Sequence, residues 1–239
     1  MKLNEIKPLF EGGNIFKDEN KKPVTVRINK ADVDPTLKWL EKIVKLPLID
    51  NKLGSTGIRS TSGDLDIAVD QSKISKDELV KKLKKWTDKY GLDSREWIRK
   101  SGISVHFKTP IRGDWPTDDP TFVQTDLMFG DPDWMKFSLQ GSGDDTPYKG
   151  VHRQLLLASI AKANGLKWSS AAGLTSRESG DLISKDPDRI AEVLLGDGRT
   201  AKDLTTVESI IKAIKGHPEY NELVADAKAA FAKDNLKLP

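Results

Sequence analysis

Apolar and polar residues alternate from Asp64 to Asp70, which is the pattern of a β-strand with one buried face. Two carboxylates, Asp64 and Asp66, fall on one face of this strand, and the apolar residues between and after them fall on the other. The apolar face can pack on a core while the acidic face meets solvent or a metal ion. We therefore take this strand as the centre of the molecule.

The hydrophobic pattern of the remaining chain predicts an α+β fold in which a mixed sheet is followed by helices. Ser75 and Glu78 form a capping-box pattern at a helix start. The predicted elements, in order, are a hairpin of 14–16 with 24–28, a helix from 34 that ends before 47, the acidic strand, a helix from 75, strands around 103–107 and 122–129, and helices over 151–164, 187–196, 203–215 and 218–234. We expect an N-terminal accessory hairpin and helix over 1–44, a sheet domain over 45–143, and a helical domain with a C-terminal extension over 144–239.

The segment just before the acidic strand, from Gly54 to Gly63, is rich in glycine, serine and threonine. Backbone N–H groups and hydroxyls in such a turn can approach the oxygens of a polyphosphate closely, and Arg59 adds a positive charge. The spacing fits neither the P-loop nor the dinucleotide-binding glycine motif. Because two neighbouring carboxylates repel each other unless a divalent cation neutralises them, the stretch predicts an ion held between protein and nucleotide.

Two motifs around the acidic strand resemble the signature of the DNA polymerase beta-like nucleotidyltransferase superfamily. Gly54-Ser55, a loop, and then Ser62-Gly63-Asp64-Leu65-Asp66 are similar to the family pattern of Gly-Ser followed by Asp-x-Asp on a strand. The family also has a third carboxylate on a neighbouring strand, which Asp126 matches within Thr121–Phe129. The resemblance implies a nucleotidyltransferase palm built on a mixed sheet.

The resemblance continues into the helical half of the chain. Leu139-Gln140-Gly141-Ser142 is similar to the Thr-Gly-Ser turn that ends the palm of family X DNA polymerases, and 156–174 is similar to the helix and turn of their thumb. These parts occur in the family order over roughly 45–195. The chain thus looks like a minimal family X palm and thumb.

This resemblance implies a metal-dependent nucleotidyltransferase. It would move a nucleoside monophosphate from an NTP or dNTP to an acceptor hydroxyl, most readily a DNA or RNA 3′ end, and release pyrophosphate. Asp64, Asp66 and Asp126 would be the catalytic residues and would hold two Mg²⁺ ions, with Mn²⁺ as a substitute, and Asp126 would accept the proton of the hydroxyl. The implied nucleotide-binding residues are Gly54, Ser55, Arg59, Ser62, Gly63, Gly141, Ser142 and Arg153.

Two alternatives remain beside nucleic-acid extension. Within the same class, the acceptor could be tRNA, a protein or a small molecule. In a different class, the chain could be a catalytically inactive nucleic-acid-binding module. The three carboxylates speak against an inactive module. The position of Arg59 favours it slightly, since the family usually places its phosphate-binding arginines directly after Gly-Ser, where this chain has Thr56-Gly57-Ile58. We interpret His106 and His152 as structural rather than catalytic residues.

Composition narrows the class of protein further. The chain has 239 residues, of which 37% are hydrophobic, so it can bury a packed core. It has no cysteine, which excludes disulfides and thiolate metal sites and fits a reducing compartment. No apolar run is long enough for a membrane span and Met1–Glu5 does not open a signal peptide, so we expect a soluble, cytoplasmic monomer. The net charge of +3 permits a nucleic-acid partner without arguing for one.

Overall fold

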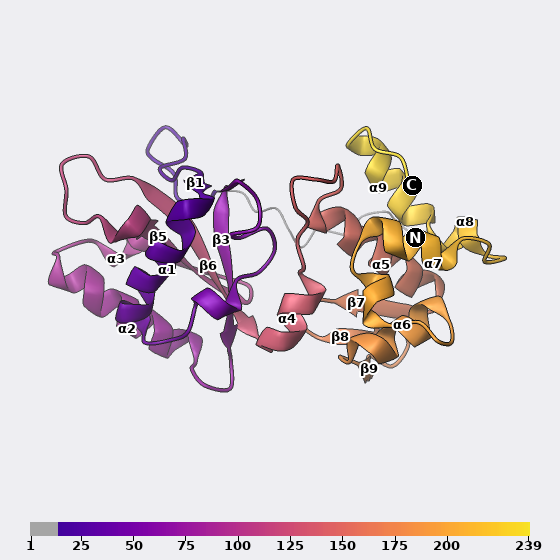
Figure 1. The fold of residues 1–239 in the computed structure, drawn as a ribbon. Helices are drawn as coiled ribbons and strands as arrows, with labels where there is room; N and C mark the ends of the chain where they lie inside the picture. The colour runs from indigo at the N-terminus through magenta and orange to yellow at the C-terminus, as the bar shows by residue number, and fades with distance from the viewer. Residues whose placement is uncertain (1–13) are drawn as a thin grey trace.

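The computed structural model describes residues 14–239, and the first part of the predicted accessory segment, residues 1–13, lies outside the described residues. The described chain forms two lobes joined through the segment that contains helix α4 (Figure 1). The first lobe holds a mixed sheet and the C-terminal lobe is mostly helical, so the expected α+β class is confirmed. None of the helices in residues 14–239 combines the length and the apolar character that a membrane span requires.

The first lobe contains every strand and helix up to α4. Its elements are β1 (Ile28–Asn29), α1 (Lys30–Val44), a 3-10 turn (Ile49–Asn51), β2 (Thr61–Ser62), β3 (Asp64–Asp70), α2 (Lys76–Lys89), α3 (Ser94–Trp97), β4 (Ile98–Ser101), β5 (Ser104–Pro110), a 3-10 turn (Ile111–Gly113), β6 (Phe122–Gly130) and α4 (Pro132–Ser138).

Four of these strands form one sheet in the order β3–β6–β5–β4. β3 and β6 run parallel, whereas β6 with β5 and β5 with β4 run antiparallel. A parallel pair needs a long crossover, and α2 with the β4–β5 hairpin supplies it between β3 and β6. The two strands that carry the predicted acidic residues therefore lie side by side.

One face of this sheet packs against α1 and α2. Leu65 and Ile67 from β3 and Leu127 from β6 are completely buried there, together with Leu37 of α1 and Leu79 of α2. Each such side chain contributes about 1.5–3 kcal/mol to folding, which fixes the register of β3 and β6. The residues between them must then point to the opposite face.

The opposite face carries a smaller apolar cluster at one end. Ala68 of β3 and Met128 of β6 contact Met135 and Leu139 of the α4 segment, with Leu53 beside them. This contact attaches α4 to the sheet, so the chain leaves the first lobe close to the acidic residues of β3. The rest of that face is left to polar side chains.

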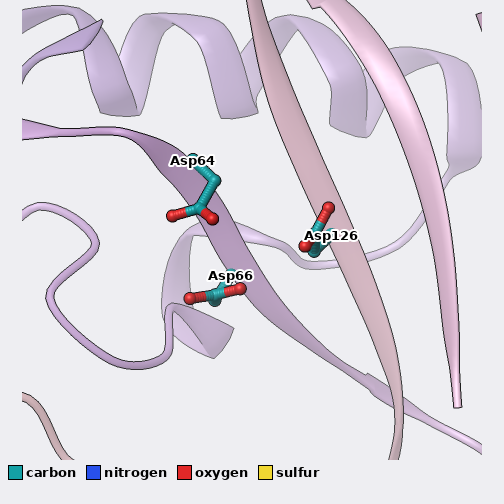
Figure 2. A group of neighbouring side chains, drawn as sticks. All are labelled: Asp64, Asp66 and Asp126. Atoms are coloured by element: carbon teal, nitrogen blue, oxygen red, sulfur yellow. The ribbon is translucent and has the colours of Figure 1, made fainter. Parts of the chain in front are cut away.

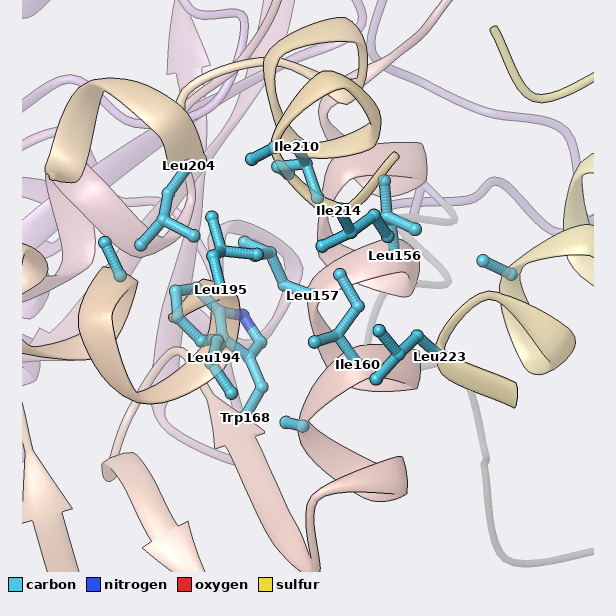
Figure 3. Packing of buried hydrophobic residues seen from close by; sticks show 14 of the residues in the cluster. Leu156, Leu157, Ile160, Trp168, Leu194, Leu195, Leu204, Ile210, Ile214 and Leu223 are labelled. Carbon is cyan, nitrogen blue, oxygen red and sulfur yellow. The ribbon is translucent and has the colours of Figure 1, made fainter. Parts of the chain in front are cut away.

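The second lobe is built around helix α5 (Figure 3). Leu156, Leu157 and Ile160 of α5 are fully buried among residues of the later helices, including Ile210 and Leu223. The elements of this lobe are α5 (Gly150–Ala163), β7 (Leu166–Ser169), β8 (Gly173–Ser176), β9 (Leu182–Ser184), α6 (Pro187–Leu195), a 3-10 turn (Ala201–Leu204), α7 (Val207–Ile214), α8 (Tyr220–Leu223) and α9 (Ala225–Lys233).

Several local expectations differ from the structure. The helix expected from Asp34 begins at Lys30. Val33, which lies one helical turn before Leu37, is buried in the core and extends the apolar face of the helix toward its start. The expected N-terminal hairpin is only partly formed: Val24 N–H donates to the Phe16 carbonyl at 3.0 Å, but Val26 N–H donates to Phe122 at the start of β6. The segment is therefore shared between the hairpin and the main sheet.

The sequence pattern does not predict several short strands that the structure contains. The second lobe was expected to be helical, yet it contains the three-stranded sheet β7–β8–β9, and β4 was not foreseen in the first lobe. Each of these strands has only three or four residues. Such lengths are too short to show an alternating pattern, which explains why the sequence did not reveal them.

The capping box of α2 is confirmed and gives a test of local stability. Ser75 Oγ accepts from Glu78 N–H at 3.2 Å, and the Glu78 carboxylate accepts from Ser75 N–H at 2.9 Å. We expect Ser75→Ala to lower the free energy of unfolding by about 1 kcal/mol, because a helix N–H loses its acceptor, and Ser75→Asp to retain it. Urea denaturation measures both, and equal losses in the two variants would contradict the cap.

Candidate metal and phosphate site

Three carboxylates converge on the polar face of the parallel strand pair (Figure 2). Asp64 and Asp66 come from β3, and Asp126 comes from β6, directly beside Asp66 in the strand register. One oxygen from each residue lies within 4.8 Å of those of the other two. The structure therefore brings together the three residues expected to be catalytic.

The alternation of the strands explains this convergence. The residues on either side of Asp66 in β3, Leu65 and Ile67, point into the core under α1 and α2, and those on either side of Asp126 in β6, Thr125 and Leu127, are also fully buried. Because side chains alternate between faces, both carboxylates are pushed to the other side of the sheet. Core packing thus sets the position of the acidic group.

The three carboxylates are electrostatically unfavourable together. Burial and the nearby charge of Asp126 raise the pKa of Asp64 to about 6, even though Arg27 favours its ionised form. Burial, followed by the charges of Asp64 and Asp126, holds the pKa of Asp66 well above its usual range. A bound cation would remove this penalty, since it favours the ionised form of every carboxylate that it touches.

The turn at Gly54 and Ser55, which is predicted to bind phosphate, lies directly against the turn at Leu139–Ser142, which ends the first lobe. Gly54 has φ of +58° and donates its N–H to the Leu139 carbonyl at 3.1 Å, and it pairs with Gln140 in a short parallel bridge. A Cβ on Gly141 would lie 2.2 Å from the Gly54 carbonyl oxygen and 2.7 Å from Ser55 N. Only glycine at 141 permits this contact, which connects two motifs that are far apart in the sequence.

The remaining residues of the turn support the acidic strand. Thr56 Oγ1 accepts from the backbone N–H of Asp66 at 3.0 Å, so the loop is held to β3 at the residue that carries one of the carboxylates. Ser62 is buried, and its hydroxyl lies 3.5 Å from the Ser55 carbonyl. Gly63 lies under Arg27, whose guanidinium would be 3.3 Å from an added Cβ. Ser62 and Gly63 therefore shape the turn, and phosphate contacts from them stay a prediction.

Arg59 lies at the same junction between the lobes. Its guanidinium donates to the Ser142 carbonyl at 3.1 Å and to the Ser142 hydroxyl at 3.2 Å, and Asp144 lies 3.9 Å away. Asp144 also accepts from Ser60 N–H at 3.0 Å. The structure thus brings together two residues predicted to bind nucleotide, Arg59 after the Gly54 turn and Ser142 at the end of the first lobe.

Arg153 has a different environment. It is 3% exposed, and its guanidinium donates to the carbonyls of Leu204 at 2.6 Å and of Phe137 and Ser138 at 3.1 Å. Burial lowers the pKa of Arg153 to about 10. Its contacts join the end of α4 to the C-terminal part of the second lobe. Carbonyl groups take its Nε and Nη1 donors, whereas its buried Nη2 has no hydrogen-bond partner among residues 14–239, and a nucleotide-binding role for this residue stays a prediction.

Two grooves lie near these residues, and neither is lined by the three carboxylates. One of about 500 Å³ lies where the lobes meet and includes Gly141, Ser142 and Lys149 in its lining. The other, of about 620 Å³, lies at the far end of β3 and includes Asp70 and Asp131. The clustered carboxylates, rather than either groove, define the candidate site, because groove volume alone identifies no functional group.

Sequence reasoning missed the residues that hold Asp126. His106 Nδ1 lies 2.7 Å from Asp126 Oδ1, and Gln124 Nε2 donates to Asp126 Oδ2 at 3.2 Å. Gln124 is two residues from Asp126 and shares its face, a signal available from strand alternation. The contact of His106 depends on the pairing of β5 with β6, for which the sequence carries no local signal.

Comparison with protein-family models finds no match to the chain, and a search of curated proteins finds no significantly similar one. The residues and their geometry therefore carry the functional conclusion.

The raised pKa values predict how pH affects the metal-free protein. Because the fold favours the protonated forms of Asp64 and Asp66, this contribution to stability is present near pH 4. The part from Asp64 is lost as the pH rises through about 6, and the part from Asp66 is lost as the pH rises through its own raised pKa. In EDTA at pH 8, Asp66→Asn should therefore have a higher urea midpoint than the wild type, and the difference should shrink toward pH 4.

The matched control for this measurement is Asp70→Asn on the same strand. Hydrogen bonds from Ser72 lower the pKa of Asp70, so its ionised form stabilises the fold and its neutralisation should lower the midpoint at pH 8. A lower midpoint for Asp66→Asn at pH 8 would show that the acidic cluster is not under repulsion.

The contact between the two turns gives a separate prediction. Gly141→Ala should reduce the free energy of unfolding by about 1–3 kcal/mol, because the new methyl group overlaps the Gly54 backbone. Gly143→Ala is the control, since its Cβ would meet only the movable end of the Asp145 side chain. Urea midpoints of both variants test this, and a fully stable Gly141→Ala would disprove the close approach.

Proposed function

We propose that this protein is a metal-dependent nucleotidyltransferase that transfers a nucleoside monophosphate from an NTP or dNTP to an acceptor hydroxyl. The observation that carries the proposal is the convergence of Asp64, Asp66 and Asp126 oxygens within 4.8 Å on two neighbouring strands. The adjoining turn of Gly54 and Ser55 supports it, because a polyphosphate would have to lie beside the carboxylates to share a cation with them.

The donor set fits a hard divalent cation. Mg²⁺ and Mn²⁺ prefer oxygen ligands, and the cluster offers three carboxylates whose mutual repulsion a cation relieves. Bound ions of this kind would neutralise the phosphates and activate the attacking hydroxyl. The absence of cysteine from the chain leaves no competing thiolate site for softer metals.

The protein's own groups would supply binding, orientation and a proton acceptor. Asp126, the most buried of the three, would take the proton of the attacking hydroxyl. Arg59 would bind the phosphates by exchanging its contact with the neutral oxygens of Ser142 for one with anionic oxygens, in which donor and acceptor are both charged. The N–H of Gly54 is committed to Leu139, so the hydroxyl of Ser55 is the group that this turn would offer.

A nucleic-acid 3′ end is the acceptor we favour. The turn at Gly141 and Ser142 leads from the sheet lobe into a second, helical lobe, and a groove of about 500 Å³ is lined by this turn and by residues of the second lobe. A strand end could enter this groove beside the acidic cluster. Transfer to tRNA, a protein or a small molecule is the alternative outcome of the same assay.

Incubation with α-labelled NTPs and dNTPs, Mg²⁺, and a panel of primed DNA, single strands and tRNA tests the proposal. We expect labelled acceptor and pyrophosphate from the wild type, and a loss of at least about 100-fold in Asp126→Ala, because charge stabilisation at the phosphates is removed. Asp70→Asn, at the far end of β3, is the matched control and should retain activity. Equal incorporation by wild type and Asp126→Ala would overturn the mechanism.

A further inference from the structure

His106 faces the acidic cluster from strand β5. The antiparallel register of β5 and β6 pairs His106 directly with Asp126, and the ring nitrogen Nδ1 lies 2.7 Å from Asp126 Oδ1. His106 is only 8% exposed, so this hydrogen bond is shielded from water. The histidine comes from a strand that contributes no carboxylate to the cluster.

The chemistry of the two groups fixes the direction of the hydrogen bond. An ionised carboxylate can only accept a hydrogen bond, so the proton is on Nδ1 and the N–H of the ring donates a hydrogen bond to Asp126. A second donor, Gln124 Nε2, reaches the other oxygen at 3.2 Å. The Gln124 amide cannot be reversed, because its Oε1 accepts from Ile15 N–H at 2.9 Å. Each oxygen of Asp126 is therefore held by one donor and keeps capacity for one more partner.

The other ring nitrogen of His106 makes no hydrogen bond with the described residues. Nε2 is buried and has no hydrogen-bond partner among residues 14–239. A buried polar atom without a partner costs free energy, and an apolar side chain of similar size would avoid that cost. What His106 provides in return is the single hydrogen bond to Asp126.

We propose that His106 is a positioning residue that fixes the carboxylate plane of Asp126 and so presents its free lone pairs to the cation. This inference rests on the cation site of the proposed function. The terminal torsion of an aspartate is broad, so without the His106 donor the carboxylate would be held by Gln124 alone and its plane would be less well fixed. Hydrogen-bond partners of metal-binding side chains typically change metal affinity 10- to 100-fold when removed.

Mn²⁺ alone is the probe, and the amount of free Mn²⁺ is measured by electron paramagnetic resonance at pH 7.5. His106→Leu should weaken binding 10- to 100-fold, because the ring is replaced by an apolar side chain without a donor. His106→Asn should stay within about threefold of the wild type, since the amide nitrogen takes the place of Nδ1. This rescue would not occur if the ring only filled space.

Thr109→Val is the matched structural control. Thr109 and Thr125 share a buried hydrogen bond of 2.7 Å between the same two strands, but on the opposite face of the sheet. This variant should keep wild-type Mn²⁺ affinity, and thermal denaturation of all the variants establishes that they are folded.

The outcomes separate this inference from the function on which it rests. Wild-type Mn²⁺ affinity in His106→Leu would overturn the role of His106 and leave the transferase proposal intact. Mn²⁺ binding that is absent from the wild type, or unchanged in Asp126→Ala, would overturn the cation site and both proposals. Binding without nucleotidyl transfer would overturn the enzyme activity alone.

Discussion

The repulsion among three carboxylates on one face of a parallel strand pair is the constraint on which the site depends. Asp64, Asp66 and Asp126 are held together because their neighbours in the strands are locked into an apolar core. The hydrophobic packing is strong enough to keep the charges close, and it does so at the cost of raised pKa values for Asp64 and Asp66. Perturbed pKa values of this kind are typical of functional sites, where locally unfavourable interactions reduce stability and are kept because the site needs them.

Main-chain contacts fix the turn beside the acidic cluster, whereas side-chain hydrogen bonds hold the carboxylate of Asp126. The turn at Gly54 is fixed by main-chain contacts with Leu139 and Gly141, which hold it against the segment that leads out of the first lobe. Side chains act nearer the charges, where His106 and Gln124 hold the two oxygens of Asp126. The same site thus combines a rigid backbone with side chains that hold the acidic group in place, an arrangement suited to binding a charged ligand.

The sequence predicted what depends on local periodicity and missed what depends on pairing. The alternation around Asp64 and Asp66 and the cap at Ser75 are local signals, and the structure has both. The contact of His106 with Asp126 spans two strands, and no residue near His106 encodes the register. The burial of Arg153 was also hidden, because the carbonyls that accept from its Nε and Nη1 atoms come from the end of α4 and from Leu204.

During synthesis on the ribosome, two polar side chains of α5, His152 and Arg153, emerge well before the residues that they contact. All four strands of the main sheet are complete by Gly130, so the acidic lobe can assemble while the later chain is still being made. Arg153, by contrast, needs the Leu204 carbonyl, and His152 pairs with Asp234, only a few residues from the end of the described chain. A nascent chain halted before these partners emerge would carry the complete strands of the acidic sheet beside a half-built helical lobe, in which Arg153 lacks the Leu204 carbonyl and His152 lacks Asp234.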